Sequence, residues 1–289
     1  MVVDRSIGVG VGGTGGWRAL AWAAEQAERT GTRLVLLHVC APGSPLERVS
    51  GEPVPAELEL IDPPLARAFT KIRERLGGQR VALRIFTGDA PTALADASAG
   101  VRLLVVGSAG DGRTVRRVLR QSHCPVVVAR PASPTTSETR FRGHVVVGVD
   151  ASAASRTAMD FAVAYADGHA LPLAVVHVSA VGSDDYFYDD VTLPAHFTAE
   201  PATSQMLAAA TEPWALKCPT IPIRRAVVHG PVVDALLRAG AGAELLVVGD
   251  KRRGVLGRAR TGDVPLTVAT GAPCPVAVVP MDQQESARL

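Results

Sequence analysis

Short apolar runs alternate with segments of helical periodicity along the second half of the chain. One such segment, 156–167, places Ala158, Phe161, Ala162 and Tyr165 at the spacing of one helix face. Apolar runs of roughly four to eight residues between turn residues are typical of buried strands. The pattern predicts strands at 144–149, 173–178, 223–228, 244–248 and 276–279. It predicts helices at 156–167, 205–217 (interrupted by Pro213), 231–241 and 264–270, and a polar connection at 179–204.

Strands that alternate with helices predict an α/β fold, because parallel strands need crossover connections and these are usually helical. Right-handed crossovers place helices on both faces of the sheet, so we expect a doubly wound parallel sheet. Ligands of such open sheets bind beyond the carboxyl ends of the strands. We therefore expect function at 150–155, 178–181 and 249–263.

The chain repeats itself, since three blocks recur in the same order in its two halves. The longest match pairs 81–110 with 223–252, at an offset of 142 residues. At a later Cys-Pro pair, Cys124 in the first half and Cys274 in the second, the offset is 150 residues. The first half therefore lacks eight residues in one loop.

A segment rich in Pro, Ser and Thr separates the two halves, and this composition is typical of a linker. The length of 289 residues also fits two domains. We predict a first domain at 1–131, a linker at 132–141 and a second domain at 142–289.

Composition excludes several classes of function. A net charge of +2 and 4% aromatic residues argue against a nucleic-acid binder. No apolar run approaches the length of a membrane span, and the first residues lack the apolar stretch of a secretory signal. The four cysteines lie far apart, so they predict no metal or redox pair. We expect a cytoplasmic protein.

Residue usage also indicates the source of the chain. Arg outnumbers Lys 27 to 3 and asparagine is absent, as in proteins encoded by GC-rich bacterial genomes. Arg richness alone therefore says little about partners.

Four motifs stand in order in the second half: V-G-V-D-x-S at 147–152, G-x-x-x-D-A-L-L at 230–237, L-L-V-V-G at 245–249 and A-P-C-P-V at 272–276. With the repeat, they make both halves resemble the universal stress protein family, and the chain looks like a tandem-domain member. The resemblance covers nearly the whole chain. It implies five parallel strands in each domain, the adenine nucleotide alpha hydrolase-like fold, and association through the last strand. Many members bind ATP.

The resemblance implies where a nucleoside would lie. ATP-binding members carry an Asp at the end of the first strand, which contacts the nucleoside end of the ligand. Asp150, flanked by Val149 and Ala151, matches it. Val178 ends the next strand, so we add it to the expected site.

The family's phosphate loop follows the fourth strand and reads Gly, two residues, Gly, nine residues, Gly, then Ser or Thr. Gly249 and Gly262 match its first and third glycines, whereas Arg252 replaces the second and Asp263 replaces the hydroxyl residue. A carboxylate at 263 repels phosphate, although it caps the following helix well. Cations in the same loop supply compensating charge: Lys251, Arg252, Arg253, Arg258 and Arg260.

The first half departs further from the family pattern. Gly12 occupies the position of Asp150, and the glycine after Gly107 and Gly110 comes too early, at Gly112. We expect this half to bind no nucleotide and to act as a structural partner of the second half in a pseudo-two-fold dimer.

Other motifs have simpler interpretations. The G-x-G-x-x-G at 8–13 lacks the acidic residue that a dinucleotide site needs after the next strand, so we favour a glycine-rich turn. His38 and His177 recur at equivalent positions, which favours a shared packing role. Asp184, Asp185, Asp189 and Asp190 offer oxygen ligands for a divalent metal, but a solvated loop is the favoured interpretation and we predict no metal site.

Together these observations predict a nucleotide-responsive regulatory or stress-response protein. ATP, with Mg²⁺, is the expected ligand of the second half. We do not expect an enzyme, although slow ATP hydrolysis stays open, with Asp263 as the candidate base. The alternative is a structural or protein-interaction module that has lost nucleotide binding in both halves. Expected partners are the other half, a second copy of the chain and unidentified proteins.

Overall fold

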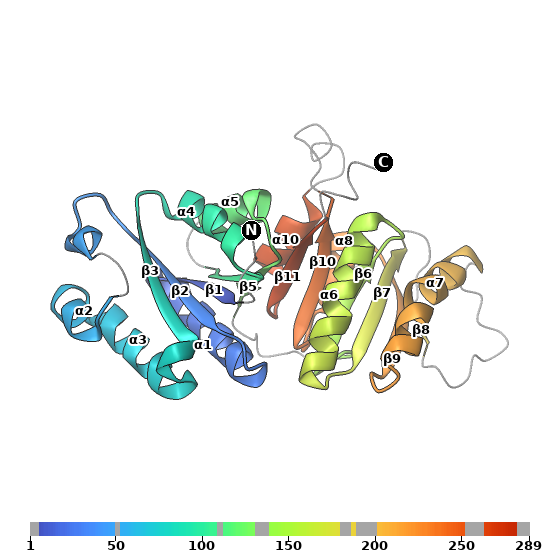
Figure 1. The fold of residues 1–289 in the computed structure, drawn as a ribbon. Coiled ribbons are helices and arrows are strands. Elements are labelled where there is room, and N and C mark those ends of the chain that lie inside the picture. Colours follow the sequence, from blue (N-terminus) through green and yellow to red (C-terminus); the bar gives the residue numbers. More distant parts are fainter. Residues whose placement is uncertain are drawn as a thin grey trace. The chain divides into compact units, whose positions relative to one another are not determined.

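The computed structural model of the chain forms two compact units, Met1–Arg130 and Pro131–Leu289. It describes residues 6–49, 53–108, 112–130, 139–179, 186–188, 201–251 and 263–281. In both units strands and helices alternate along the chain (Figure 1). The predicted α/β fold with a mainly parallel sheet is therefore confirmed.

The first unit holds five parallel strands in the order β3-β2-β1-β4-β5. The strands are β1 (Ile7–Val11), β2 (Leu34–Cys40), β3 (Val81–Thr87), β4 (Leu103–Gly107) and β5 (Val126–Ala129). The helices are α1 (Gly13–Arg29), α2 (Pro55–Ile61), α3 (Pro63–Leu76), α4 (Ala90–Ala97) and α5 (Arg113–Gln121).

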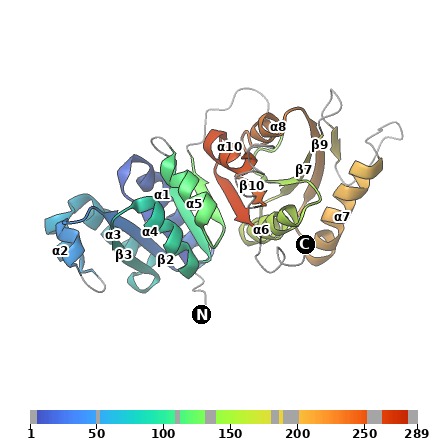
Figure 2. The same cartoon turned by 90° about the horizontal axis from the view of Figure 1, so that it is seen from above.

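The second unit repeats this arrangement in the order β11-β10-β6-β7-β9-β8. Its strands are β6 (Val145–Val149), β7 (Leu173–Ser179), β8 (Tyr186–Tyr188), β9 (Ile223–His229), β10 (Leu245–Asp250) and β11 (Val276–Pro280). Its helices are α6 (Ala153–His169), α7 (Pro201–Lys217), α8 (Val232–Ala239) and α10 (Val264–Gly271). Figure 2 shows α6 and α7 on one face of the sheet and α8 and α10 on the other.

β8 adds a strand that the sequence did not predict, within the connection at 179–204. It pairs antiparallel with β9, with Tyr186 opposite Val227. Three residues are too few to reveal a period, although an aromatic run favours strand formation. The other strands follow the predicted runs within about two residues, since apolar stretches buried on both faces carry the clearest signal.

The glycines of the first strand are packing residues. Gly8 and Gly10 lie inside β1, not in the turn after it. A Cβ at Gly10 would meet Leu94 of α4 at 3.1 Å, and one at Gly8 would meet Leu37 and Val101 at 3.2 Å. Close packing of side chains on the sheet therefore accounts for both glycines, and the glycine-rich turn expected at 8–13 is confined to Gly12 and Gly13.

Candidate functional site

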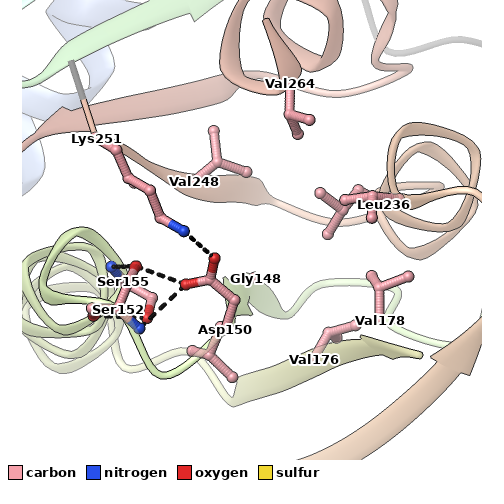
Figure 3. A pocket seen from close by; sticks show the side chains of 13 residues that line it. Gly148, Asp150, Ser152, Ser155, Val176, Val178, Leu236, Val248, Lys251 and Val264 are labelled. Atoms are coloured by element: carbon pink, nitrogen blue, oxygen red, sulfur yellow. Dashed lines mark hydrogen bonds and ion pairs between the residues drawn. The ribbon is translucent and has the colours of Figure 1, made fainter. Parts of the chain in front are cut away.

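The candidate site is a pocket at the carboxyl ends of the parallel strands of the second unit (Figure 3). Its cavity volume is about 160 Å³. Five residues expected from the sequence line it: Val149, Asp150, Val178, Gly249 and Lys251. The pocket thus lies where a doubly wound sheet is expected to bind its ligand.

The walls of the pocket are aliphatic. Val176 and Val178 share one face of β7, because side chains two residues apart in a strand point the same way. Val232 and Leu236, one helical turn apart on α8, face the same cavity, and Val248 of β10 adds to the wall. Such a slot accepts a flat apolar group. Of these five residues the sequence singled out Val178 alone, although the two- and four-residue spacings were a usable signal.

Polar groups gather at one end of the slot, around Asp150. Its Oδ2 accepts a hydrogen bond from Lys251 Nζ at 2.5 Å. Its Oδ1 accepts from the backbone N–H of Ser152 at 3.2 Å and from Ser152 Oγ at 2.6 Å. Burial raises the pKa of Asp150, but the hydrogen bonds from Lys251 and Ser152 outweigh it, so the pKa lies below its usual value. Asp150 is therefore ionised at neutral pH.

Sheet topology brings Lys251 to Asp150 although 101 positions separate them. β10 pairs with β6, so the residues that follow these two strands meet at the same edge of the sheet. Ser152 in turn caps α6, since its Oγ accepts from the backbone N–H of Ser155 at 3.2 Å. The ion pair therefore connects the loop after β6 with the loop after β10. The family resemblance implies that the first of these loops contacts the nucleoside and the second contacts the phosphates.

The turn after β6 carries backbone strain at Ala151, whose φ is 61°. This left-handed region costs a residue with a Cβ roughly 1 kcal/mol. The second residue after β1 in the first unit is a glycine, Gly13, with φ of 62°. Ala151 was predicted to contact nucleotide, but it does not line this pocket; it lines a second pocket between α6 and α7.

Ala151→Gly is expected to raise the free energy of unfolding by about 0.5–1 kcal/mol, because glycine adopts this φ without strain. Ala170, at the C-cap of α6 with φ of 51°, supplies the matched control. Ala170→Gly should give a similar gain, and urea denaturation measures both. A loss of stability in Ala151→Gly alone would mean that the methyl group of Ala151 makes contacts worth more than the strain.

Gly249 is held by helix packing. A Cβ at this position would collide with the backbone carbonyl of Ala154 in α6. Gly107 has the same relation to Gly15 of α1 in the first unit. The glycine is thus kept in both halves, including the one expected to bind no nucleotide. Close approach of strand and helix accounts for this glycine in both units.

Asp263 is the N-cap of α10, as expected. Its Oδ1 accepts a hydrogen bond from the backbone N–H of Leu266 at 3.3 Å. Its neighbour Val264 lines the pocket, whereas Asp263 does not. The remaining loop residues of the prediction lie outside the described part of the chain: Arg252, Arg253, Arg258, Arg260 and Gly262.

The first unit lacks the carboxylate of this site. Val11 pairs with His38 as Val149 pairs with His177, so Gly12 stands where the second unit has Asp150. His177 donates from Nδ1 to the carbonyl of Val149 at 2.9 Å and so holds the end of β6. This contact assigns His177 a structural role.

No group of three or more His, Cys, Asp or Glu side chains suited to a metal ion occurs among the described residues. The acidic residues Asp184, Asp185, Asp189 and Asp190 lie outside them. Within the described ranges, no helix is both long and apolar enough to cross a membrane.

Comparison with known proteins identifies the family of the chain. The sequence profile of the universal stress protein family matches residues 5–130 and 142–280. A universal stress protein of Mycobacterium tuberculosis is 30% identical over 279 residues, which cover 90% of this chain and 91% of the relative. One from Mycolicibacterium smegmatis is 26% identical over 275 residues, which cover 90% of this chain and 92% of the relative. The crystal structure of a universal stress protein from Archaeoglobus fulgidus shares the fold, with a TM-score of 0.65 at 14% identity over 96% of this chain and 97% of that chain. The chain therefore belongs to the universal stress protein family and carries the family's domain twice in tandem.

Proposed function

We propose that the second unit binds an adenine nucleotide, ATP in the first instance, in the pocket beside Asp150. The protein would then act in the stress response as a nucleotide-responsive regulator in the cytoplasm and not as an enzyme. One observation carries the proposal. A single pocket with aliphatic walls is lined by four residues expected from the sequence: Asp150, Val178, Gly249 and Lys251.

The chemistry of the slot suits a nucleoside. A purine ring is flat and largely apolar on its faces, so it fits between Val176, Leu236 and Val248. The Asp150 carboxylate accepts hydrogen bonds, which sugar hydroxyls and an exocyclic amine can donate. The volume of about 160 Å³ lies below the roughly 300–1,000 Å³ of sites that enclose a whole drug-sized ligand. We therefore place the base in the slot and the phosphates outside it, towards the loop that begins at Lys251.

The ion pair between Lys251 and Asp150 must break when the ligand forms a hydrogen bond with Asp150 Oδ2. The two side chains are 34% and 51% exposed, so the pair contributes about 0–1 kcal/mol. Its loss would weaken binding by about fivefold at most, since 1.4 kcal/mol corresponds to tenfold. The released ammonium group can pair with a phosphate, which offsets this cost.

Asp263→Ser is expected to tighten ATP binding by about fivefold, because it removes a like charge near the phosphates while keeping an N-cap for α10. Asp62→Ser is the matched control. Asp62 caps α3 in the first unit by accepting from Leu65 N–H at 3.0 Å. Calorimetric titration with Mg²⁺·ATP should find the control unchanged. Unchanged or weaker binding in Asp263→Ser would place the phosphates elsewhere.

A second candidate function is an interaction module without nucleotide. Two observations favour it. The Asp150 carboxylate already accepts a hydrogen bond from Lys251, and the Asp263 carboxylate already caps the N-terminus of α10, where a phosphate would bind. Pull-down partners that stay the same with and without ATP would support this candidate. The pairing of the two halves as a pseudo-dimer is also a prediction. So is the association of two chains, which sedimentation tests.

Slow ATP hydrolysis would need a general base near the phosphates. Asp263 is the candidate base, but its Oδ1 accepts the capping hydrogen bond of α10. We therefore propose binding without efficient turnover. Turnover that disappears in Asp263→Ala would establish hydrolysis instead.

A further inference from the structure

A second pocket lies in the same unit between α6 and α7, and it shares Val149 and Ser155 with the lining of the pocket beside Asp150. Its cavity volume is about 700 Å³, several times that of the pocket beside Asp150. Figure 2 shows the two helices that border it together on one face, opposite α8 and α10. The volume falls within the roughly 300–1,000 Å³ of small-molecule sites.

One stripe of α7 forms a wall of this pocket. Ala202, Met206, Ala209 and Pro213 line it at the three- and four-residue spacings of one helix face, and Trp214 borders this stripe. Leu207 and Thr211 are buried, and Arg225 of β9 donates to Thr211, so that side of α7 packs on the sheet. The lining stripe is therefore a separate face of the helix, and its alanines leave the space beside α6 open.

The repeat provides an internal comparison. α3 occupies the same place in the first unit, between the second and third strands and beside the first helix. It buries Leu65, Phe69, Ile72 and Leu76. At the matching place α7 carries small residues, and a pocket remains. The pocket is open to solvent, because Ala202, Ala209 and Pro213 of its lining are exposed, so a small molecule can reach it.

The lining indicates the chemistry of the occupant. Met159 and Met206, two of the four methionines, and Trp214, one of the three tryptophans, supply polarizable and aromatic surface. The charged lining residues are one cation, Arg156, and one carboxylate, Asp160. Their charges balance, so the pocket favours neither an anionic nor a cationic ligand. We propose that this pocket binds an uncharged, planar, mostly apolar small molecule. The proposal stands whether or not the other pocket binds nucleotide.

Titration of the full chain with Nile red, an uncharged planar dye, tests the proposal. We expect saturable binding at one site per chain, with the blue-shifted emission of an apolar environment. Ala210→Phe places a ring in the pocket and should weaken binding roughly tenfold or more. Leu216→Phe is the control, because Leu216 lies on the same helix, is 84% exposed and does not line the pocket.

Met206→Gln provides a second variant, which keeps the length of the side chain and makes it polar. It should also weaken binding, and it decides the matter if Ala210→Phe does not fold. Thermal unfolding checks that each variant is folded. Binding that is not saturable in the wild type, or that folded Ala210→Phe and Met206→Gln both retain, would overturn the proposal.

Discussion

Gly249→Ala is expected to lower the free energy of unfolding by about 3 kcal/mol or more. The added Cβ would collide with the backbone carbonyl of Ala154, and backbone cannot move aside as a flexible side chain can. Strand β10 and helix α6 would have to separate at the centre of the second unit. For a unit of this size the loss corresponds to a fall in melting temperature of about 10 °C.

Two controls make this prediction specific. Gly107→Ala repeats the collision in the first unit, against Gly15, and should destabilise that unit similarly. Gly168→Ala lies in an exposed part of α6 where an added Cβ meets nothing within 4 Å, so it should raise stability by about 0.5 kcal/mol. Urea denaturation measures all three variants. A Gly249→Ala protein as stable as the wild type would contradict the packing role of this glycine.

Asp150→Ala is expected to weaken adenosine binding by about 10–100-fold. Hydrogen bonds to a charged group contribute about 1.5–3 kcal/mol, and the variant removes the one carboxylate among the described residues that line the slot. Adenosine is the better ligand for this test because it has no phosphate group. With ATP, the Lys251 ammonium group freed by the substitution can pair with a phosphate and mask part of the loss.

Asp89→Ala is the matched control for this substitution. Asp89 accepts hydrogen bonds from Thr92 N–H at 3.1 Å and Thr92 Oγ1 at 2.6 Å, much as Asp150 accepts from Ser152. It caps α4 in the first unit, where no nucleotide is expected. Equal affinity in Asp150→Ala and wild type would remove Asp150 from the site and favour the interaction module.

The sequence predicted best those features that appear as a local pattern of residues or that occur in both halves. Buried parallel strands appear as apolar runs, and the V-G-V-D-x-S motif ends at the turn that holds Asp150. The duplication made Gly12 the counterpart of Asp150 in the first half, and the strand registers of the two units agree with this equivalence. These features depend on neighbours in the chain or on a second copy of the same pattern.

Features that depend on distant residues were missed. The contact between Lys251 and Asp150 arises from the pairing of β10 with β6, which a linear pattern does not report. The packing role of Gly249 depends on Ala154 of a helix almost a hundred positions earlier. α7 continues through Pro213, where a break was expected, and the pocket beside it becomes visible only when α6 is in place.

The most direct test of the proposed function is calorimetric titration of the whole 289-residue chain with ATP in the presence of Mg²⁺. The asymmetry between Asp150 and Gly12 predicts one bound nucleotide per chain. Binding at one site per chain that Asp150→Ala weakens and Asp89→Ala leaves unchanged is the expected result. No binding at millimolar ATP, or two equivalent sites per chain, would contradict it.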